Sequence, residues 1–354
     1  MGIILKKNLT KSLFASVLLL LFVAVSFNLH AETRKDTLVS VAVRDTFKLR
    51  KAQVFETEAA TMLYFRPKPF QFLKYVPSDI AGLGKAAVAK KNLPMMGAIA
   101  ASTVAFILVD QKVTDAAQQF GRYINLDPTR TTKTLVNVDL GSFDIDLLEI
   151  PQNLNSVFYF FGEGWPSIVI AGGFYSYGLA ANDYRALQTT SQLTEMFFTL
   201  GITTQFLKRI TGRQSPFRVD TDPNPVPGGK WHLFTAPSKY QKSVSNYDAF
   251  PSGHLATAMA TLTVIAGNYP DNKYIKPVGY SMMGLLGFAM LNNGVHWISD
   301  YPLALAIGYT CGKLALSRGR QLIPKPGVDH GSFSSLMPAY MGNGGIGLTY
   351  RAIF

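Results

Sequence analysis

The chain has 354 residues, of which 48% are hydrophobic and 16% are charged, and its formal net charge is +12. This composition excludes an intrinsically disordered chain and a coiled coil. The charged fraction lies below the roughly 25% of average soluble domains, which favours a membrane-associated protein. The single cysteine, Cys311, excludes an intramolecular disulfide and a zinc site built from cysteines.

The N-terminus has the pattern of a secretory signal peptide. Three lysines precede an apolar run over residues 13–27, and Ala31 closes a cleavage site. The run is short for a membrane span, so we predict cleavage after residue 31 rather than an uncleaved anchor helix. The rest of the chain stays basic, which suits an anionic membrane surface or a phosphate-bearing substrate, and no nucleic acid partner is expected for an exported protein.

Residues 32–93 are mixed and basic, and we interpret them as an exported N-terminal segment on the surface. Within it, 80–93 is predicted to form an amphipathic helix, either at a membrane interface or as an ordinary surface helix.

Six apolar segments follow, at 94–109, 157–181, 193–207, 255–269, 278–291 and 303–316. Each is long enough for a helix and none alternates with period two, so we predict an all-α fold, a six-helix bundle over 94–320. Several are shorter than the ~20 residues of a clean membrane span. They are either short, tilted membrane helices, which we favour, or buried core helices. The C-terminal tail, 321–354, is predicted to be a hairpin or a flexible segment around the glycine-rich stretch 342–345.

A histidine lies at the predicted start of the fourth helix. The sequence Pro-Ser-Gly-His ends at His254, directly before an apolar run. Ser252 is a good N-cap, and Gly253 lets the backbone approach a ligand closely. The unpaired N–H groups of a helix start form an anion site, where a histidine meets a phosphate oxygen.

A second histidine, His296, precedes Asp300 by four residues. On a helix these two side chains would share one face. A carboxylate bonded to one ring nitrogen fixes the tautomer and leaves the other nitrogen as a nucleophile or a base.

A cluster of cations closes the third predicted helix, and it includes Lys208 and Arg213. One interpretation is a basic helix end that complements the helix dipole and lipid headgroups. The other is a cationic clamp for phosphoryl oxygens. The long loop that follows, 211–250, is of a length usually found in functional or disordered segments.

Together these residues resemble the type 2 phosphatidic-acid phosphatase superfamily, which includes lipid phosphatases, class A acid phosphatases and vanadium haloperoxidases. The family pattern is K-x6-R-P, then P-S-G-H, then S-R-x5-H-x3-D. Lys208, Ser252, Gly253, His254, His296 and Asp300 match it. Both motif arginines are replaced, the first by Ser215 and the second by Met290.

The resemblance implies hydrolysis of a phosphate monoester or a pyrophosphate, without metal or other cofactor, through a phosphohistidine on His296. Asp300 would orient that imidazole, and His254 would act as acid and then as base. Lys208, Ser252 and Gly253 would hold the phosphate, with Arg213 as a helper. The expected substrate is an envelope lipid phosphate, and the expected location is the inner membrane with a periplasm-facing site, or the periplasm.

The missing arginines leave alternatives open, because each would have been a bidentate donor to the phosphoryl group. The chain is a working phosphatase, a soluble periplasmic acid phosphatase of the same fold, or a non-catalytic phosphate-binding or lipid-binding relative. A vanadium haloperoxidase is disfavoured, because its vanadate also depends on those arginines. The oligomeric state is not predicted.

Overall fold

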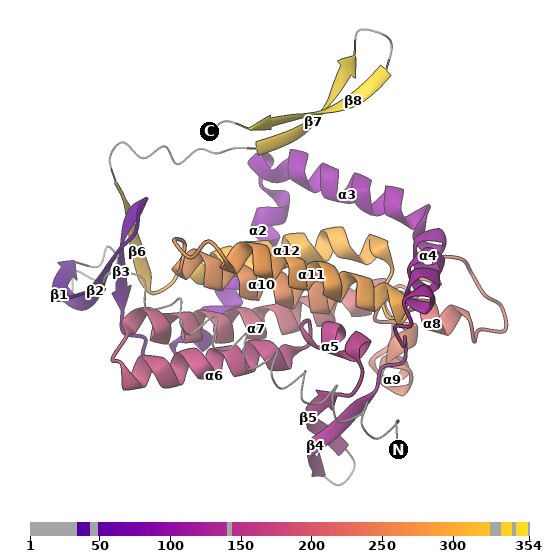
Figure 1. The fold of residues 1–354 in the computed structure, drawn as a ribbon, viewed down its shortest axis with the longest axis horizontal. Coiled ribbons are helices and arrows are strands. Elements are labelled where there is room, and N and C mark those ends of the chain that lie inside the picture. Colours follow the sequence, from indigo (N-terminus) through magenta and orange to yellow (C-terminus); the bar gives the residue numbers. More distant parts are fainter. Residues whose placement is uncertain (1–33, 43–48, 140–143, 326–333, 342–344, 353–354) are drawn as a thin grey trace.

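The computed structural model describes residues 34–42, 49–139, 144–325, 334–341 and 345–352. The predicted signal peptide, 1–31, and most of the predicted turn at 342–345 lie outside these residues. The chain is mostly helical (Figure 1). The longer helices are α2 (Val76–Val88), α3 (Leu93–Ile107), α4 (Asp110–Tyr123), α5 (Leu154–Phe160), α6 (Gly164–Ala180), α7 (Tyr184–Thr211), α10 (Gly253–Asn268), α11 (Ile275–Asn292) and α12 (Tyr301–Leu316). The short ones are η2 (Gln71–Lys74), η3 (Lys90–Asn92), α8 (Pro216–Val219), α9 (Pro237–Lys242), η4 (Val244–Asn246) and η5 (Ile298–Asp300).

A helix forms at each of the six predicted apolar segments, but only five of these helices build the core. Helices α6, α7, α10, α11 and α12 run side by side along the long axis (Figure 1) and bury a shared apolar cluster. Helix α3 buries none of its residues. The prediction of a six-helix bundle is therefore corrected to five long helices, because helix-length hydrophobicity alone does not tell a packed helix from an exposed one.

Small residues bring α10 and α12 into close contact. A Cβ added to Gly308 on α12 would lie 2.3 Å from the carbonyl oxygen of Ala256 on α10. Only glycine allows the two backbones to approach this closely. This contact fixes the positions of two helices that begin at the predicted site residues.

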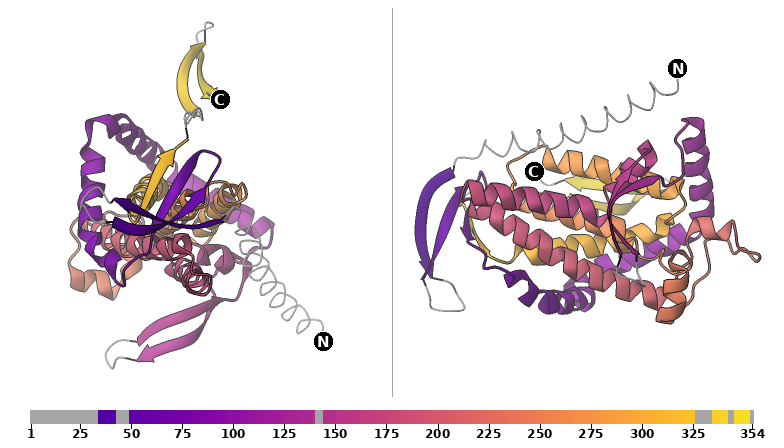
Figure 2. Two further views of the ribbon diagram at one scale, coloured as in Figure 1. Left: turned by 90° about the vertical axis from the view of Figure 1, so that its left-hand side faces the viewer. Right: turned by 90° about the horizontal axis from the view of Figure 1, so that it is seen from below.

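The described residues also form three small antiparallel sheets, so the prediction of an all-α fold is wrong in this respect. The strands are β1 (Arg34–Ala42), β2 (Leu49–Glu56), β3 (Ala60–Phe65), β4 (Thr132–Asp139), β5 (Asp144–Pro151), β6 (Arg320–Pro324), β7 (Ser334–Met341) and β8 (Gly345–Ala352). One sheet has the order β1-β2-β3-β6, and β4–β5 and β7–β8 are hairpins. The four-stranded sheet stands at one end of the bundle (Figure 2). These strands are only 5 to 9 residues long, so they lack the long apolar runs that identified the helices.

Polar residues are buried inside α7. The Glu195 side chain is fully buried, and its carboxyl group lies 3.9 Å from the Arg318 guanidinium. Burial raises the pKa of Glu195 to about 10, and Asp79 adds to the shift. Glu195 is therefore neutral at physiological pH.

The prediction of membrane helices can be compared with the length and hydropathy of the observed helices. Among the described helices, none is by itself long and apolar enough to span a bilayer. One bent pair, 90–107 and 110–123, meets the length and composition of a broken span, with 68° between its two parts.

Candidate active site

His296 and Asp300 lie close together at the start of α12. They do not share a helix face as predicted, because residues 298–300 form the 3-10 turn η5 before the α-helix begins. The His296 Nδ1 lies 2.7 Å from the Ala249 carbonyl oxygen and 3.4 Å from Asp300 Oδ2. Two acceptors at Nδ1 place the ring proton there. Nε2, which is buried and has no hydrogen-bond partner, is then left with its lone pair.

His254 lies opposite His296 at the start of α10. The two ring centroids are 5.7 Å apart, with the rings at 69° to each other. Ser252 caps α10, as predicted, by accepting a hydrogen bond from the Leu255 N–H. The Ser252 N–H donates to the Asp300 carbonyl oxygen over 3.2 Å. This bond links the segment that carries His254 to the segment that carries His296.

The environment of His254 disfavours its charged form. Burial lowers the pKa of His254 well below 6.5, and His296, Lys208 and Arg130 lower it further. Its Nδ1 is buried without a hydrogen-bond partner. With no anion beside it, His254 is therefore neutral at physiological pH, and an approaching anion would favour its protonation.

Lys208 brings a positive charge to the start of α10. Its Nζ and Cε lie 3.9 Å from the position where a Cβ on Gly253 would be, and its side chain is only 8% exposed. Its Nζ is 3.5 Å from Asp248 Oδ2. The structure thus brings Lys208, Ser252, Gly253 and the two imidazoles into one small region.

Arg213 is placed differently from the prediction. Its side chain is fully buried. Nη1 donates to Asp300 Oδ1 at 2.5 Å and to the Ser299 hydroxyl at 2.6 Å. Nη2 donates to Asp110 Oδ2 and to the Gly228 carbonyl oxygen, which also accepts from Nε. All five guanidinium donors are occupied, so Arg213 holds Asp300 in place and has no donor left for a phosphate.

Asp110 is a contributor that the sequence did not reveal. It is the first residue of α4, is fully buried, and accepts from Arg213 at 2.5 Å. The Ser299 hydroxyl and N–H donate to it at 2.6 and 3.0 Å. Asp110 therefore fixes both Arg213 and the turn that carries Asp300. An aspartate at a helix start gives no signal of this distant pairing in the sequence.

The positions of the two replaced motif arginines are buried and uncharged. The Ser215 hydroxyl is buried without a hydrogen-bond partner. Met290 is fully buried on α11, and its sulfur lies 3.6 Å from the Ser252 hydroxyl. The structure therefore places no cation at either position. Among the described residues, no group of three or more His, Cys, Asp or Glu side chains is arranged to hold a metal ion.

The long loop between α7 and α10 supplies contacts to each part of the site. The Gly228 carbonyl accepts from Arg213, the Asp248 carboxylate pairs with Lys208, and the Ala249 carbonyl accepts from His296. The loop therefore helps to hold these three side chains in place, and its function stays a prediction.

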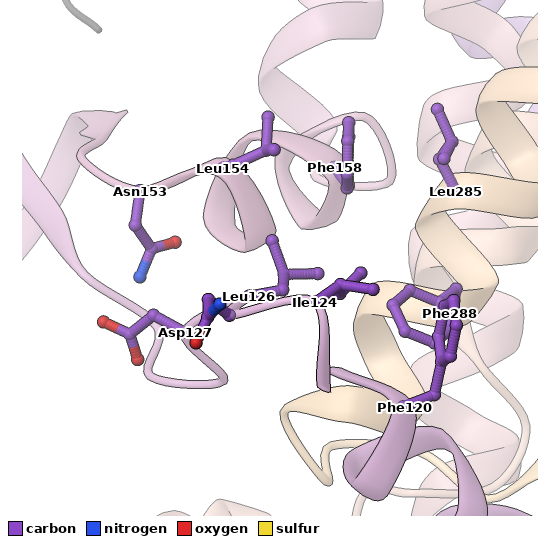
Figure 3. A pocket seen from close by; sticks show the side chains of 10 residues that line it. Phe120, Ile124, Leu126, Asp127, Asn153, Leu154, Phe158, Leu285 and Phe288 are labelled. Carbon is purple, nitrogen blue, oxygen red and sulfur yellow. The ribbon is translucent and has the colours of Figure 1, made fainter. Parts of the chain in front are cut away.

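An apolar cavity of about 550 Å³ lies between α4, α5 and α11 (Figure 3). Phe120, Ile124, Leu154, Phe158 and Phe288 supply most of its wall. Phe158 is next to Tyr159, whose ring centroid lies 4.4 Å from that of His254. Phe158 in the cavity wall and Tyr159, which contacts the His254 imidazole, are thus consecutive residues of α5.

Comparison with known protein families agrees with this geometry. A family model described as the PAP2 superfamily matches residues 189–322, a range that includes Lys208, both imidazoles and Asp300. No curated protein and no solved structure shows a significant match. Residues 189–322 are thus similar to the type 2 phosphatidic-acid phosphatase superfamily, whose members are generally phosphatases acting on phosphate esters. Asp110 lies outside the matched region.

Proposed function

We propose that the protein hydrolyses a phosphate ester through a covalent phosphohistidine on His296. The observation that carries this proposal is the His296 Nε2, which is buried without a partner while His254 lies 5.7 Å away between ring centroids. A histidine whose Nδ1 is held by acceptors and whose Nε2 is unoccupied is prepared for nucleophilic attack.

In the first step the His296 Nε2 lone pair attacks phosphorus, and the bond between phosphorus and the ester oxygen breaks. His254 gives its proton to the leaving oxygen. The anionic substrate counters the burial and the positive charges that lower the His254 pKa, so His254 is protonated when the substrate is bound.

In the second step a water molecule attacks the phosphorus of the phosphohistidine. His254, now neutral, takes the proton from this water. The bond between phosphorus and Nε2 breaks, inorganic phosphate leaves, and His296 regains its lone pair. Asp300 supports the positive charge that His296 carries while phosphorylated, at 3.4 Å from Nδ1.

The start of α10 is the proposed cradle for the non-bridging oxygens. The Gly253 N–H, the Ser252 hydroxyl and the Lys208 ammonium lie around it. Donors in fixed positions stabilise the charge that develops in the transition state without reorganising.

The apolar cavity supports a substrate with a hydrocarbon portion. Aromatic and aliphatic side chains line much of it (Figure 3). Its wall includes Phe158 of α5, and the next residue, Tyr159, contacts the His254 ring. We therefore propose a lipid phosphate, hydrolysed at the envelope membrane of an exported protein. Exposed apolar side chains on α3 and α4, including Val104 and Phe120, would contact the membrane. Co-sedimentation with vesicles of anionic phospholipid tests this contact.

A second candidate function is phosphate binding without turnover. Met290 fills the place of a motif arginine with an apolar side chain against Ser252, which favours it. Loss of one transition-state donor costs about 10²–10³ in rate, and two are absent.

Release of inorganic phosphate from a panel of lipid phosphates, pyrophosphates and small monoesters separates the two candidates. Turnover by the wild-type chain should fall at least about 10³-fold in His296→Ala, because the nucleophile is lost. His232→Ala, in the long loop, is the matched control and should stay within about twofold. If the wild type never exceeds His296→Ala on any substrate, the phosphatase proposal fails.

A further inference from the structure

We propose that Arg130, which lies outside the region matched by the superfamily, binds the substrate phosphate in place of the missing motif arginines. This inference rests on the proposed function, since it assumes that a phosphoryl group occupies the space beside His254. Arg213, the arginine that the sequence suggested for this role, has all five donors occupied.

The backbone on both sides of Arg130 is anchored to the start of α5. The Thr129 carbonyl accepts from the Asn153 side-chain amide at 2.6 Å. The Thr131 N–H donates to the Ser156 hydroxyl at 3.0 Å. Asn153 is also the N-cap of α5, so the helix start and the arginine segment form one unit. Arg130 is therefore held in a defined position although it lies in a loop.

The Arg130 guanidinium and the His254 imidazole share Tyr159 as a neighbour. The Arg130 Cζ lies 5.5 Å from the centroid of the Tyr159 ring, and that ring lies 4.4 Å from the His254 ring. The positive charges of Lys208 and Arg130 both act on the His254 pKa, in the direction that lowers it. A phosphoryl group beside His254 would therefore have two cations in its neighbourhood, Lys208 at the start of α10 and Arg130 beside Tyr159.

Arg130 also has the exposure that substrate binding needs. Its side chain is 45% exposed, and Nη2 donates to Glu163 Oε1 at 3.0 Å. Glu163 follows Gly162, whose added Cβ would lie 2.6 Å from the His254 Cβ, so this ion pair is at the edge of the site. An incoming phosphate competes with the Glu163 carboxylate for the guanidinium. The planar guanidinium of Arg130 can donate to two phosphate oxygens at once, as the missing motif arginines would have done.

Binding of orthovanadate to the purified full-length chain, measured by calorimetry, tests this inference. Arg130→Ala should weaken binding by at least about tenfold, the loss of one charge-assisted bidentate contact. Arg122→Ala removes the same charge from an exposed position on α4 and should change binding less than about twofold. If Arg130→Ala also stays within twofold, or if the wild type does not bind orthovanadate, the inference is overturned.

A second variant separates phosphate binding from a structural role. Glu163→Gln removes the carboxylate that competes with phosphate, so binding should be equal to that of the wild type or tighter. If Arg130 served only as the partner of Glu163, Glu163→Gln would lose as much as Arg130→Ala, and the inference would fall. Vanadate binding is measured without turnover, so failure here is distinct from failure of the phosphatase proposal, which His296→Ala tests by phosphate release.

Discussion

The buried pair of Asp110 and Arg213 makes a quantitative prediction for Asp110→Asn. In the wild type, Asp110 accepts from Arg213 Nη2 and from the Ser299 hydroxyl through Oδ2, and from the Ser299 N–H through Oδ1. Every group that faces this carboxylate is a donor. An asparagine in either orientation must therefore place its NH₂ group opposite a donor.

The expected loss follows from these contacts. Breaking a buried ion pair by removing one partner typically costs 3–5 kcal/mol. Asp300 still compensates the charge of Arg213 at 2.5 Å, which reduces this figure, while the unsatisfied donor adds about 1–3 kcal/mol. We expect the free energy of unfolding to fall by about 3 kcal/mol. Because Arg213 and Ser299 both position the turn of Asp300, kcat should also fall, by roughly tenfold.

Urea unfolding followed by circular dichroism measures the first effect, and phosphate release measures the second. Asp115→Asn is the matched control, because Asp115 is exposed on the same helix and accepts a single bond from Gln111 at 2.9 Å. Its unfolding free energy should change by less than about 0.5 kcal/mol. Equal stability of the two variants would refute the assignment of Asp110 as a positioning residue.

Two further predictions concern the bundle. Glu195→Gln should flatten the pH dependence of stability. The Glu195 pKa is raised from 4.5 to about 10 in the folded chain, so protonated Glu195 stabilises the fold below pH 4.5 and this contribution is lost as pH rises toward 10, by up to about 1.4 kcal/mol per unit. Unfolding free energies at several pH values measure this slope, with the exposed Glu58→Gln as control. Parallel curves for Glu195→Gln and the wild type would contradict the prediction. Gly308→Ala should lower the free energy of unfolding by roughly 1–3 kcal/mol, because its Cβ would meet the Ala256 carbonyl at 2.3 Å. Gly284→Ala, with nothing within 4 Å of its Cβ, should be neutral or stabilising. A melting temperature for Gly308→Ala equal to that of Gly284→Ala would count against the close packing.

Helix positions were predictable from sequence because each apolar run is longer than the longest described strand, β1, which has 9 residues. The N-cap at Ser252 was predictable because capping is a local interaction between residues three apart. The sheet β1-β2-β3-β6 was not, since β3 pairs with β6 across more than 250 residues, as Thr61 with Ile323. Such pairings depend on the folded bundle that brings the two ends together.

Parts of the site were predictable for the same reason. His254 and His296 were found because each lies in a short motif whose residues act together. Arg213 was assigned to the wrong partner, because its proximity in sequence to Lys208 suggested a shared ligand. In the structure the two side chains point to different groups, Asp248 and Asp300. Asp110 and Arg130 carry no local signal, since their partners are 103 and 33 residues away.

The bond between Asp110 and Arg213 also bears on how this chain can be divided into transferable parts. The segment that carries the superfamily motifs begins at residue 189, yet the residue that clamps its arginine comes from the helix that starts at 110. A chimaera that exchanges only the motif-bearing half with a relative would leave a buried guanidinium without its second counter-ion. A segment that is transferred with this ion pair preserved must therefore begin at or before the start of α4.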